Sequence, residues 1–128
     1  ARPVQFVTMA SERSDPVLAS AVKALSSRKA ERLVVLDLRG KATFTDYFVI
    51  CHGTSDRQVK SLAEDVEESV RVETGRKPVV EGLPHAEWVL MDYGDFIVHV
   101  FGEEAREFYR LEGLWGDCPE VDPRTVAS

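Results

Sequence analysis

The sequence predicts an α/β fold, a mixed five-stranded sheet with helices packed on it in the order αββαβββα. Three observations support this prediction. Apolar residues recur at helical spacing in separate stretches, each opened by residues that favour a helix N-terminus. Between them lie short runs rich in valine, isoleucine and aromatic residues, which are typical of strands. The middle helix joins two such runs, and this kind of connection implies a parallel pair of strands with a right-handed crossover.

The first helix is expected to begin after Asp15, which can cap it, with Pro16 at its first position. Two strands follow at residues 33–38 and 47–52. Because they are close in sequence, we expect them to pair as a hairpin. The apolar face of the helix comprises Val17, Leu18, Ala21, Val22 and Leu25.

The second helix carries the strongest local signal in the sequence. Ser55 and Gln58 have the spacing of a capping box, and Gly75 is expected to end the helix. A short third strand is expected at residues 77–82. The residues that recur at helical spacing are Val59, Leu62, Ala63, Val66 and Val70.

The last two strands read WVLMD and FIVHVF and are expected to form a hairpin around the dipeptide Tyr93–Gly94. Asp92 and Asp95 flank this turn, where carboxylates commonly accept hydrogen bonds from backbone N–H groups. Alternate side chains of a strand share a face, so we expect His99 to lie on the same face as Ile97 and Phe101.

The last helix is expected to begin at Glu103, since acidic residues favour a helix N-terminus. Phe108, Leu111 and Trp115 would form its apolar face, and Gly113 marks a break. This helix completes the predicted set of elements.

These elements define the expected domain boundaries. We predict a flexible segment at residues 1–14, a single domain at residues 15–116 and an irregular tail at residues 117–128. Cys51 and Cys118 are expected to be reduced, because two thiols in a chain of this length rarely form a disulfide framework.

Composition and charge narrow the classes of partner. The chain has 128 residues, 44% hydrophobic and 30% charged, which is enough for one soluble domain with its own core. Nothing resembles a signal peptide or a membrane span of ~20 apolar residues, so we expect a cytoplasmic protein with no membrane partner. The formal net charge of −6 argues against binding to DNA and favours a basic protein partner.

Catalysis by Asp92, Asp95 and His99 is disfavoured by geometry. Four residues of strand separate His99 from Asp95, which at ~3.4 Å per residue is more than about 10 Å. We expect the two aspartates to stabilise the turn and His99 to be partly buried and hydrogen-bonded.

A metal-dependent nucleotide-handling enzyme is the main catalytic alternative. Its signature would be Gly53, Thr54 and Ser55 followed by the acids Asp65 and Glu67. Two residues two positions apart on a helix diverge by ~200°, so these acids cannot hold one ion. The histidines and cysteines share no ligand spacing, and we predict no metal, no cofactor and no enzymatic activity. A direct RNA binder is disfavoured because the sequence lacks a basic aromatic platform.

Several segments together carry a family resemblance: VLDLRG, FTDYFVICHGTSDRQV, VVEG, WVLMDYGDFIVHVF and FYRLEGLW. In this order and spacing they resemble the ribosomal silencing factor family, also called the Iojap-like family. The resemblance implies a fold related to nucleotidyltransferases without their catalytic acids. It also implies binding to the large ribosomal subunit through ribosomal protein fourteen, which would block subunit association and repress translation under nutrient limitation. A role in large-subunit biogenesis is the alternative, and a homodimer is compatible with the resemblance.

The resemblance places the partner-binding surface at the last hairpin, with Trp88 as an exposed anchor. Aromatic and methionine side chains beside acids are typical of protein-binding patches. The opposite interpretation, in which Trp88 and Met91 belong to the core, stays open at this point. The residues implied in binding are Trp88, Met91, Asp92, Tyr93, Gly94 and Asp95.

Overall fold

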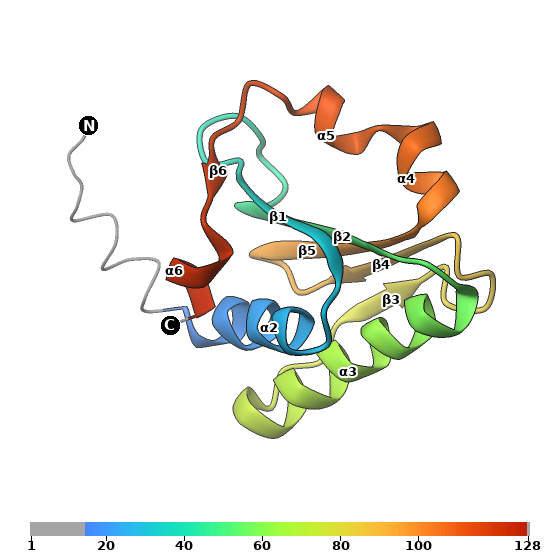
Figure 1. Ribbon diagram of the computed structural model, residues 1–128. Helices are drawn as coiled ribbons and strands as arrows, with labels where there is room; N and C mark the ends of the chain where they lie inside the picture. Colours follow the sequence, from blue (N-terminus) through green and yellow to red (C-terminus); the bar gives the residue numbers. More distant parts are fainter. Residues whose placement is uncertain (1–14, 128) are drawn as a thin grey trace.

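The computed structural model describes residues 15–127 and contains one mixed sheet with helices on both of its faces (Figure 1). The six strands lie in the order β3-β4-β5-β2-β1-β6. The segment predicted to be flexible, residues 1–14, lies outside the described residues. The elements are α2 (Pro16–Ser27), β1 (Glu31–Asp37), β2 (Tyr47–Gly53), α3 (Asp56–Thr74), β3 (Val79–Glu81), β4 (Trp88–Asp92), β5 (Phe96–Gly102), α4 (Glu103–Tyr109), α5 (Leu111–Leu114), β6 (Glu120–Val121) and α6 (Pro123–Ala127).

Strand pairing confirms the two predicted hairpins and corrects the predicted parallel pair. β1 pairs with β2, and β4 with β5, both antiparallel. The strand parallel and adjacent to β2 is β5, with Tyr47 opposite Phe96 and Gly53 opposite Gly102. β3, which follows α3 directly, lies at the edge of the sheet and pairs with β4. Six of the seven residues of β5 are buried, so it occupies the sheet centre, whereas β3 is short and partly exposed.

The tail corrects two further predictions, the strand count and the irregular C-terminal segment. Within residues 117–128, β6 adds a sixth strand antiparallel to β1, with Val121 opposite Val35. The backbone N–H of Asp37 also donates to the carbonyl of Pro119 at 2.9 Å. Helix α6 follows and buries Val126 in the main core. Val121 and Val126 are isolated apolar residues that gave no periodic signal in the sequence, yet pairing with β6 covers what would otherwise be an open edge of β1.

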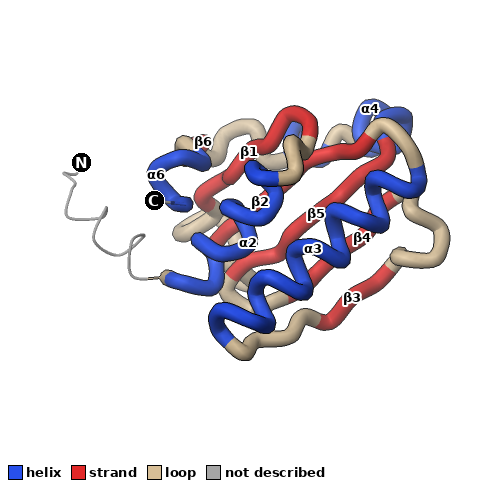
Figure 2. The backbone as a smooth tube through the Cα atoms, turned by 60° about the horizontal axis from the view of Figure 1, so that its bottom comes forward, coloured by secondary structure: helices blue, strands red, loops and turns tan. Residues whose placement is uncertain are grey.

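The two faces of the sheet have separate cores. Helices α2 and α3 lie side by side over one face, as Figure 2 shows, and α3 buries Val59, Leu62 and Val66 there. Helices α4 and α5 lie over the opposite face (Figure 1), where a smaller core forms around Phe101 and Ile50. On this second face Trp88 and Leu90 of the sheet are only partly buried, and the loop and short helices over it carry several exposed large apolar side chains.

Local capping explains why the two long helices begin where the sequence predicts. Oδ1 of Asp15 accepts hydrogen bonds from the N–H groups of Val17 and Leu18 at 3.1 and 3.0 Å. Oγ of Ser55 accepts from the N–H of Gln58 at 3.1 Å, and Gly75 ends α3 with φ +80°. The side chain of Gln58 reaches back one residue further than in a capping box and accepts from the N–H of Thr54.

Both cysteines are free thiols, as the sequence predicts. Burial raises the pKa of Cys51 to about 12, so this thiol stays protonated and behaves as a small apolar side chain. No helix within residues 15–127 combines the length and the hydropathy needed to cross a membrane.

A candidate protein-binding surface

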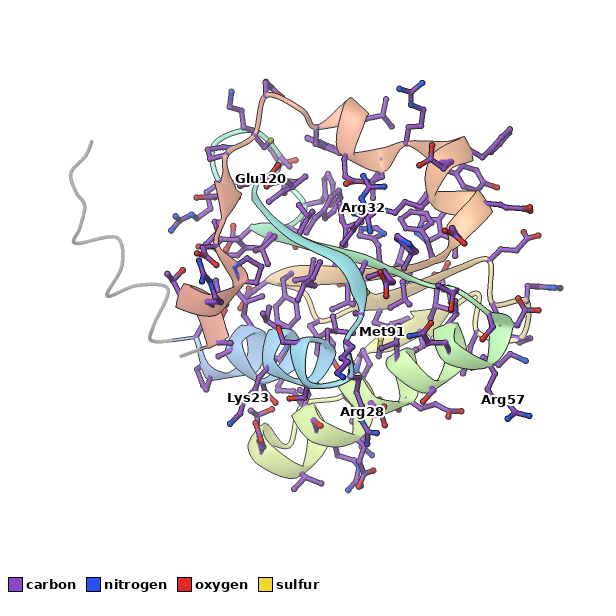
Figure 3. The ribbon with its side chains drawn as sticks, viewed as in Figure 1. Lys23, Arg28, Arg32, Arg57, Met91 and Glu120 are labelled. Carbon is purple, nitrogen blue, oxygen red and sulfur yellow. The ribbon has the colours of Figure 1, made fainter. Side chains whose placement is uncertain are left out.

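The predicted site residues of β4 are divided between the two faces of the sheet. Trp88 and Leu90 contact the smaller core, whereas Met91 and Tyr93 belong to the main core beneath α2 and α3. Met91 is 0% exposed and Tyr93 is 2% exposed, and Met91 lies between the sheet and α3 (Figure 3). The prediction that both side chains contact a partner is therefore wrong. Alternation along the strand sends them to the opposite face from Trp88.

The three remaining predicted residues lie at the turn between β4 and β5. Oδ1 of Asp92 accepts from the N–H of Gly94 at 2.8 Å, which confirms the turn role expected for this carboxylate. Gly94 has φ +92°, a conformation that glycine adopts without steric cost. The carbonyl of Asp95 accepts from the N–H of Asp46 at 2.9 Å, and the hydroxyl of Thr45 donates to the carbonyl of Gly94 at 3.0 Å. The turn is thus fixed to the loop between β1 and β2.

Trp88 lies at the other end of β4 from this turn and is half-buried rather than fully exposed. Four residues at ~3.3 Å each separate it from Asp92, so the predicted residues do not form one compact patch. Its indole Nε1 donates a hydrogen bond to Nδ1 of His99 at 3.0 Å. The ring centroid lies 4.9 Å from that of Phe101 and 4.8 Å from that of Tyr109.

His99 has the buried, hydrogen-bonded role that the sequence predicts. It is 3% exposed, and burial lowers its pKa to about 3, so the ring is neutral near pH 7. Because Nδ1 accepts the indole proton, the ring proton is on Nε2. His99 therefore holds Trp88 against the sheet by a neutral hydrogen bond.

Exposed aromatic and aliphatic side chains lie on the same side of the sheet as Trp88 and define what we call the aromatic surface. Phe44 is 57% exposed, Tyr109 43%, Phe108 78% and Leu114 74%. Neighbouring ring centroids lie 4.5–6.0 Å apart from Phe44 through Phe48, His99, Trp88 and Tyr109 to Phe108. The aromatic surface consists of Phe44, Trp88, Phe108, Tyr109, Leu114 and Trp115.

A buried arginine positions the part of this surface that α4 and α5 carry. Nε and Nη2 of Arg106 donate to the two carboxylate oxygens of Glu112 at 3.0 and 2.7 Å. Nη1 donates to the carbonyl of Glu31 at 3.2 Å and lies 3.0 Å from Nδ1 of His52, which must accept because arginine only donates. These bonds fasten the two short helices to β1 and β2. The hydrogen bonds from Arg106 lower the pKa of Glu112. The pKa of His52 is also lowered, first by burial and then by the positive charge of Arg106.

Sequence reasoning missed most of the aromatic surface. Phe108 was expected on the packed face of one helix, but it is exposed, and that helix ends at Tyr109, where the following Arg110 adopts φ +51°. The break therefore comes before Gly113. Phe44 belongs to a loop with no periodic pattern, so only its aromatic character in a polar stretch was a signal.

The alternative acidic site fails on the geometry that the sequence predicts. Asp65 pairs with Arg28 at 3.0 Å, and Glu67 is exposed on α3. In the described part of the chain, no group of three or more His, Cys, Asp or Glu side chains has a metal-binding arrangement.

A half-covered sheet face with exposed rings is typical of a protein that acts by binding another macromolecule. Residues 11–128 match the family described as "Ribosomal silencing factor during starvation". The chain therefore belongs to the ribosomal silencing factor family, which confirms the resemblance found in the sequence.

Named relatives agree with this assignment. The chain is 40% identical over 112 residues to "Ribosomal silencing factor RsfS" of Halalkalibacterium halodurans, covering 88% of this chain and 96% of the relative. It is 41% identical over 106 residues to the Bacillus subtilis protein of the same name, covering 83% and 90%. A more distant relative is the mouse "Mitochondrial assembly of ribosomal large subunit protein 1", 29% identical over 73% of this chain and 42% of that protein.

Two solved structures have the same fold. A Bacillus halodurans protein gives a TM-score of 0.72 at 41% identity over 83% of this chain and 96% of that one. A Chromobacterium violaceum protein gives a TM-score of 0.71 at 32% identity over 88% of each chain.

Proposed function

We propose that this protein is a non-enzymatic ribosomal silencing factor that binds the large ribosomal subunit through its aromatic surface. The contact on the ribosome would be ribosomal protein fourteen, and the bound factor would prevent the small subunit from joining. The outcome is repression of translation in the cytoplasm when nutrients are short. Membership of the family supports the proposal.

The observation that carries the proposal is the exposure of large apolar side chains on the loop and the short helices that cover one sheet face, beside the half-buried Trp88. Single exposed apolar residues are ordinary, but several large ones on the same side of a sheet are typical of a binding site. An interface of standard size covers about 800 Å² on each partner, which the hairpin alone cannot supply. The aromatic surface draws on the β1–β2 loop, β4, α4 and α5, and so offers a broader contact.

The predicted hairpin residues fit this proposal in part. Trp88 lies within the aromatic surface, and Asp92, Gly94 and Asp95 lie next to the loop that carries Phe44. We propose that these turn residues contact the partner at that end. The net charge of −6 would speed association with a basic ribosomal protein.

Sedimentation with purified ribosomal subunits tests the proposal. The protein should co-sediment with large subunits and not with small ones, and it should slow the association of the two. Binding to neither subunit would refute the proposed function. A homodimer formed through the same surface would compete with the ribosome, so binding would weaken as the protein concentration approaches the dimer dissociation constant.

A role in large-subunit assembly is the second candidate function, and similarity to the mouse assembly protein favours it. A cell lacking the protein would then accumulate incomplete large subunits during growth in rich medium. A purely silencing role predicts normal large subunits and a failure to repress translation on starvation. The relation to nucleotidyltransferases stays a prediction, and calorimetry with nucleotide and Mg²⁺ should detect no binding.

A further inference from the structure

A pocket of about 660 Å³ opens at the end of the sheet beside the aromatic surface. The carboxyl ends of the parallel strands β2 and β5 meet there, with Gly53 opposite Gly102. Phe108 and Tyr109 of α4 line one side. Because the rings of Tyr109 and Trp88 are 4.8 Å apart, the pocket is continuous with the aromatic surface.

The pocket is acidic and its acids are not neutralised by the protein. Its lining includes Asp56, Glu87, Glu103 and Glu104 but no lysine or arginine. All four side chains are exposed, and none forms an ion pair within residues 15–127. Arg57, next in sequence to one of these acids, points away from the molecule (Figure 3).

We propose that this pocket receives an arginine side chain of the basic protein on which the aromatic surface docks. This inference rests on the proposed function, because it concerns the same interface. A guanidinium has rigidly placed N–H groups that can donate two parallel hydrogen bonds to one carboxylate, and its flat face stacks on aromatic rings. The pocket offers both, carboxylates from Glu87 and Glu104 and rings from Phe108 and Tyr109. The phosphate of a nucleotide or of RNA would be repelled by the negative charge of the pocket carboxylates, so we do not expect it to bind there.

A double variant that replaces two carboxylates of the pocket with uncharged amides of the same size tests the inference. Glu87→Gln/Glu104→Gln should bind purified large subunits about tenfold more weakly than the wild type at low salt, with a shallower dependence of affinity on salt. The matched control Glu64→Gln/Glu73→Gln makes the same charge change at exposed positions of α3 outside this pocket and should bind within about twofold of the wild type. Wild-type affinity and salt dependence in the pocket variant would overturn the inference.

A second variant covers the case in which the double variant does not fold. Phe108 is 78% exposed, so Phe108→Leu should melt like the wild type while losing the stacking contact and about threefold in affinity. With a photoreactive benzoylphenylalanine at position 108, the crosslink should form to a ribosomal protein beside an arginine. A crosslink to ribosomal RNA would overturn the inference. If the wild type itself fails to bind large subunits, the proposed function fails. If the wild type binds and the pocket variants bind equally well, the inference alone fails.

Discussion

At the scale of single residues, the hydrogen bond from Trp88 to His99 decides how the binding face is presented. The indole is half-buried, so its orientation depends on Nδ1 of His99 and on contact with Phe101. The expectation of an exposed anchor is replaced by a half-buried ring held on two sides. Truncating Trp88 should therefore lower stability as well as binding.

Trp88→Phe keeps an aromatic ring but removes the indole N–H. Nδ1 of the buried His99 then has no donor, and we expect the free energy of unfolding to fall by about 1–2 kcal/mol. Urea unfolding followed by circular dichroism measures the change. Trp115→Phe is the control, because the Trp115 ring has no hydrogen bond to another residue between 15 and 127, and it should cost less than about 1 kcal/mol. Equal losses in the two variants would contradict the role of His99.

The buried histidines should make stability depend on pH. Burial lowers the pKa of His99 from 6.5 to about 3, so the unfolded chain binds protons more readily than the folded one. The stabilisation is complete above about pH 6.5 and is lost progressively as the pH falls toward 3, with about 2 kcal/mol lost between pH 7 and pH 5. His52, whose pKa is also lowered, adds to the loss in the same direction.

Denaturant unfolding at pH 7, 6 and 5 checks this pH dependence. His99→Phe should be less stable at pH 7 because Trp88 loses its acceptor, but its stability should vary less over this range. A slope identical to that of the wild type would show that another group titrates.

At the scale of elements, the sequence is informative where a pattern is local. Asp15, Ser55 and Gly75 predicted the bounds of α2 and α3 because capping depends on residues a few positions apart. The hairpins followed from strands that are close in sequence and, for β4 and β5, from the short turn at Tyr93–Gly94. β6, α6 and the division between α4 and α5 could not be predicted, since they depend on contacts with distant segments, such as Val121 with Val35 and Arg106 with the carbonyl of Glu31.

Glu112→Gln tests whether the buried arginine fastens α4 and α5 to the sheet. The Arg106 side chain is 2% exposed, so removing the charge that faces it should cost about 2 kcal/mol and speed amide hydrogen exchange in both helices. Glu68→Gln removes the exposed partner of Arg71 and should cost less than about 0.5 kcal/mol. Exchange that is equally slow in the two variants would contradict this role.

At the scale of the whole molecule, the binding face combines segments that are far apart in the sequence. Trp88 from β4 and Tyr109 from α4 meet, and Phe44 from a loop comes to the same side, only after the sheet has formed. The sequence therefore predicted the family, whereas Met91 and Tyr93, which were predicted to bind a partner, lie in the main core, and a partner-binding role of Trp88 stays a prediction. The acidic charge, the exposed rings and the adjoining pocket all lead to one expectation, which is a docking surface for a basic partner.

The most direct test of this account is the association of purified ribosomal subunits, followed by light scattering, in the presence of surface variants. Phe44→Ser/Leu114→Ser changes two exposed residues of the aromatic surface and should abolish the inhibition seen with the wild type, at a loss of about tenfold or more in affinity. Val72→Ser/Val79→Ser changes two residues that are each 66% exposed elsewhere and should inhibit like the wild type. Full inhibition by the Phe44/Leu114 variant, or none by the wild type, would contradict the account.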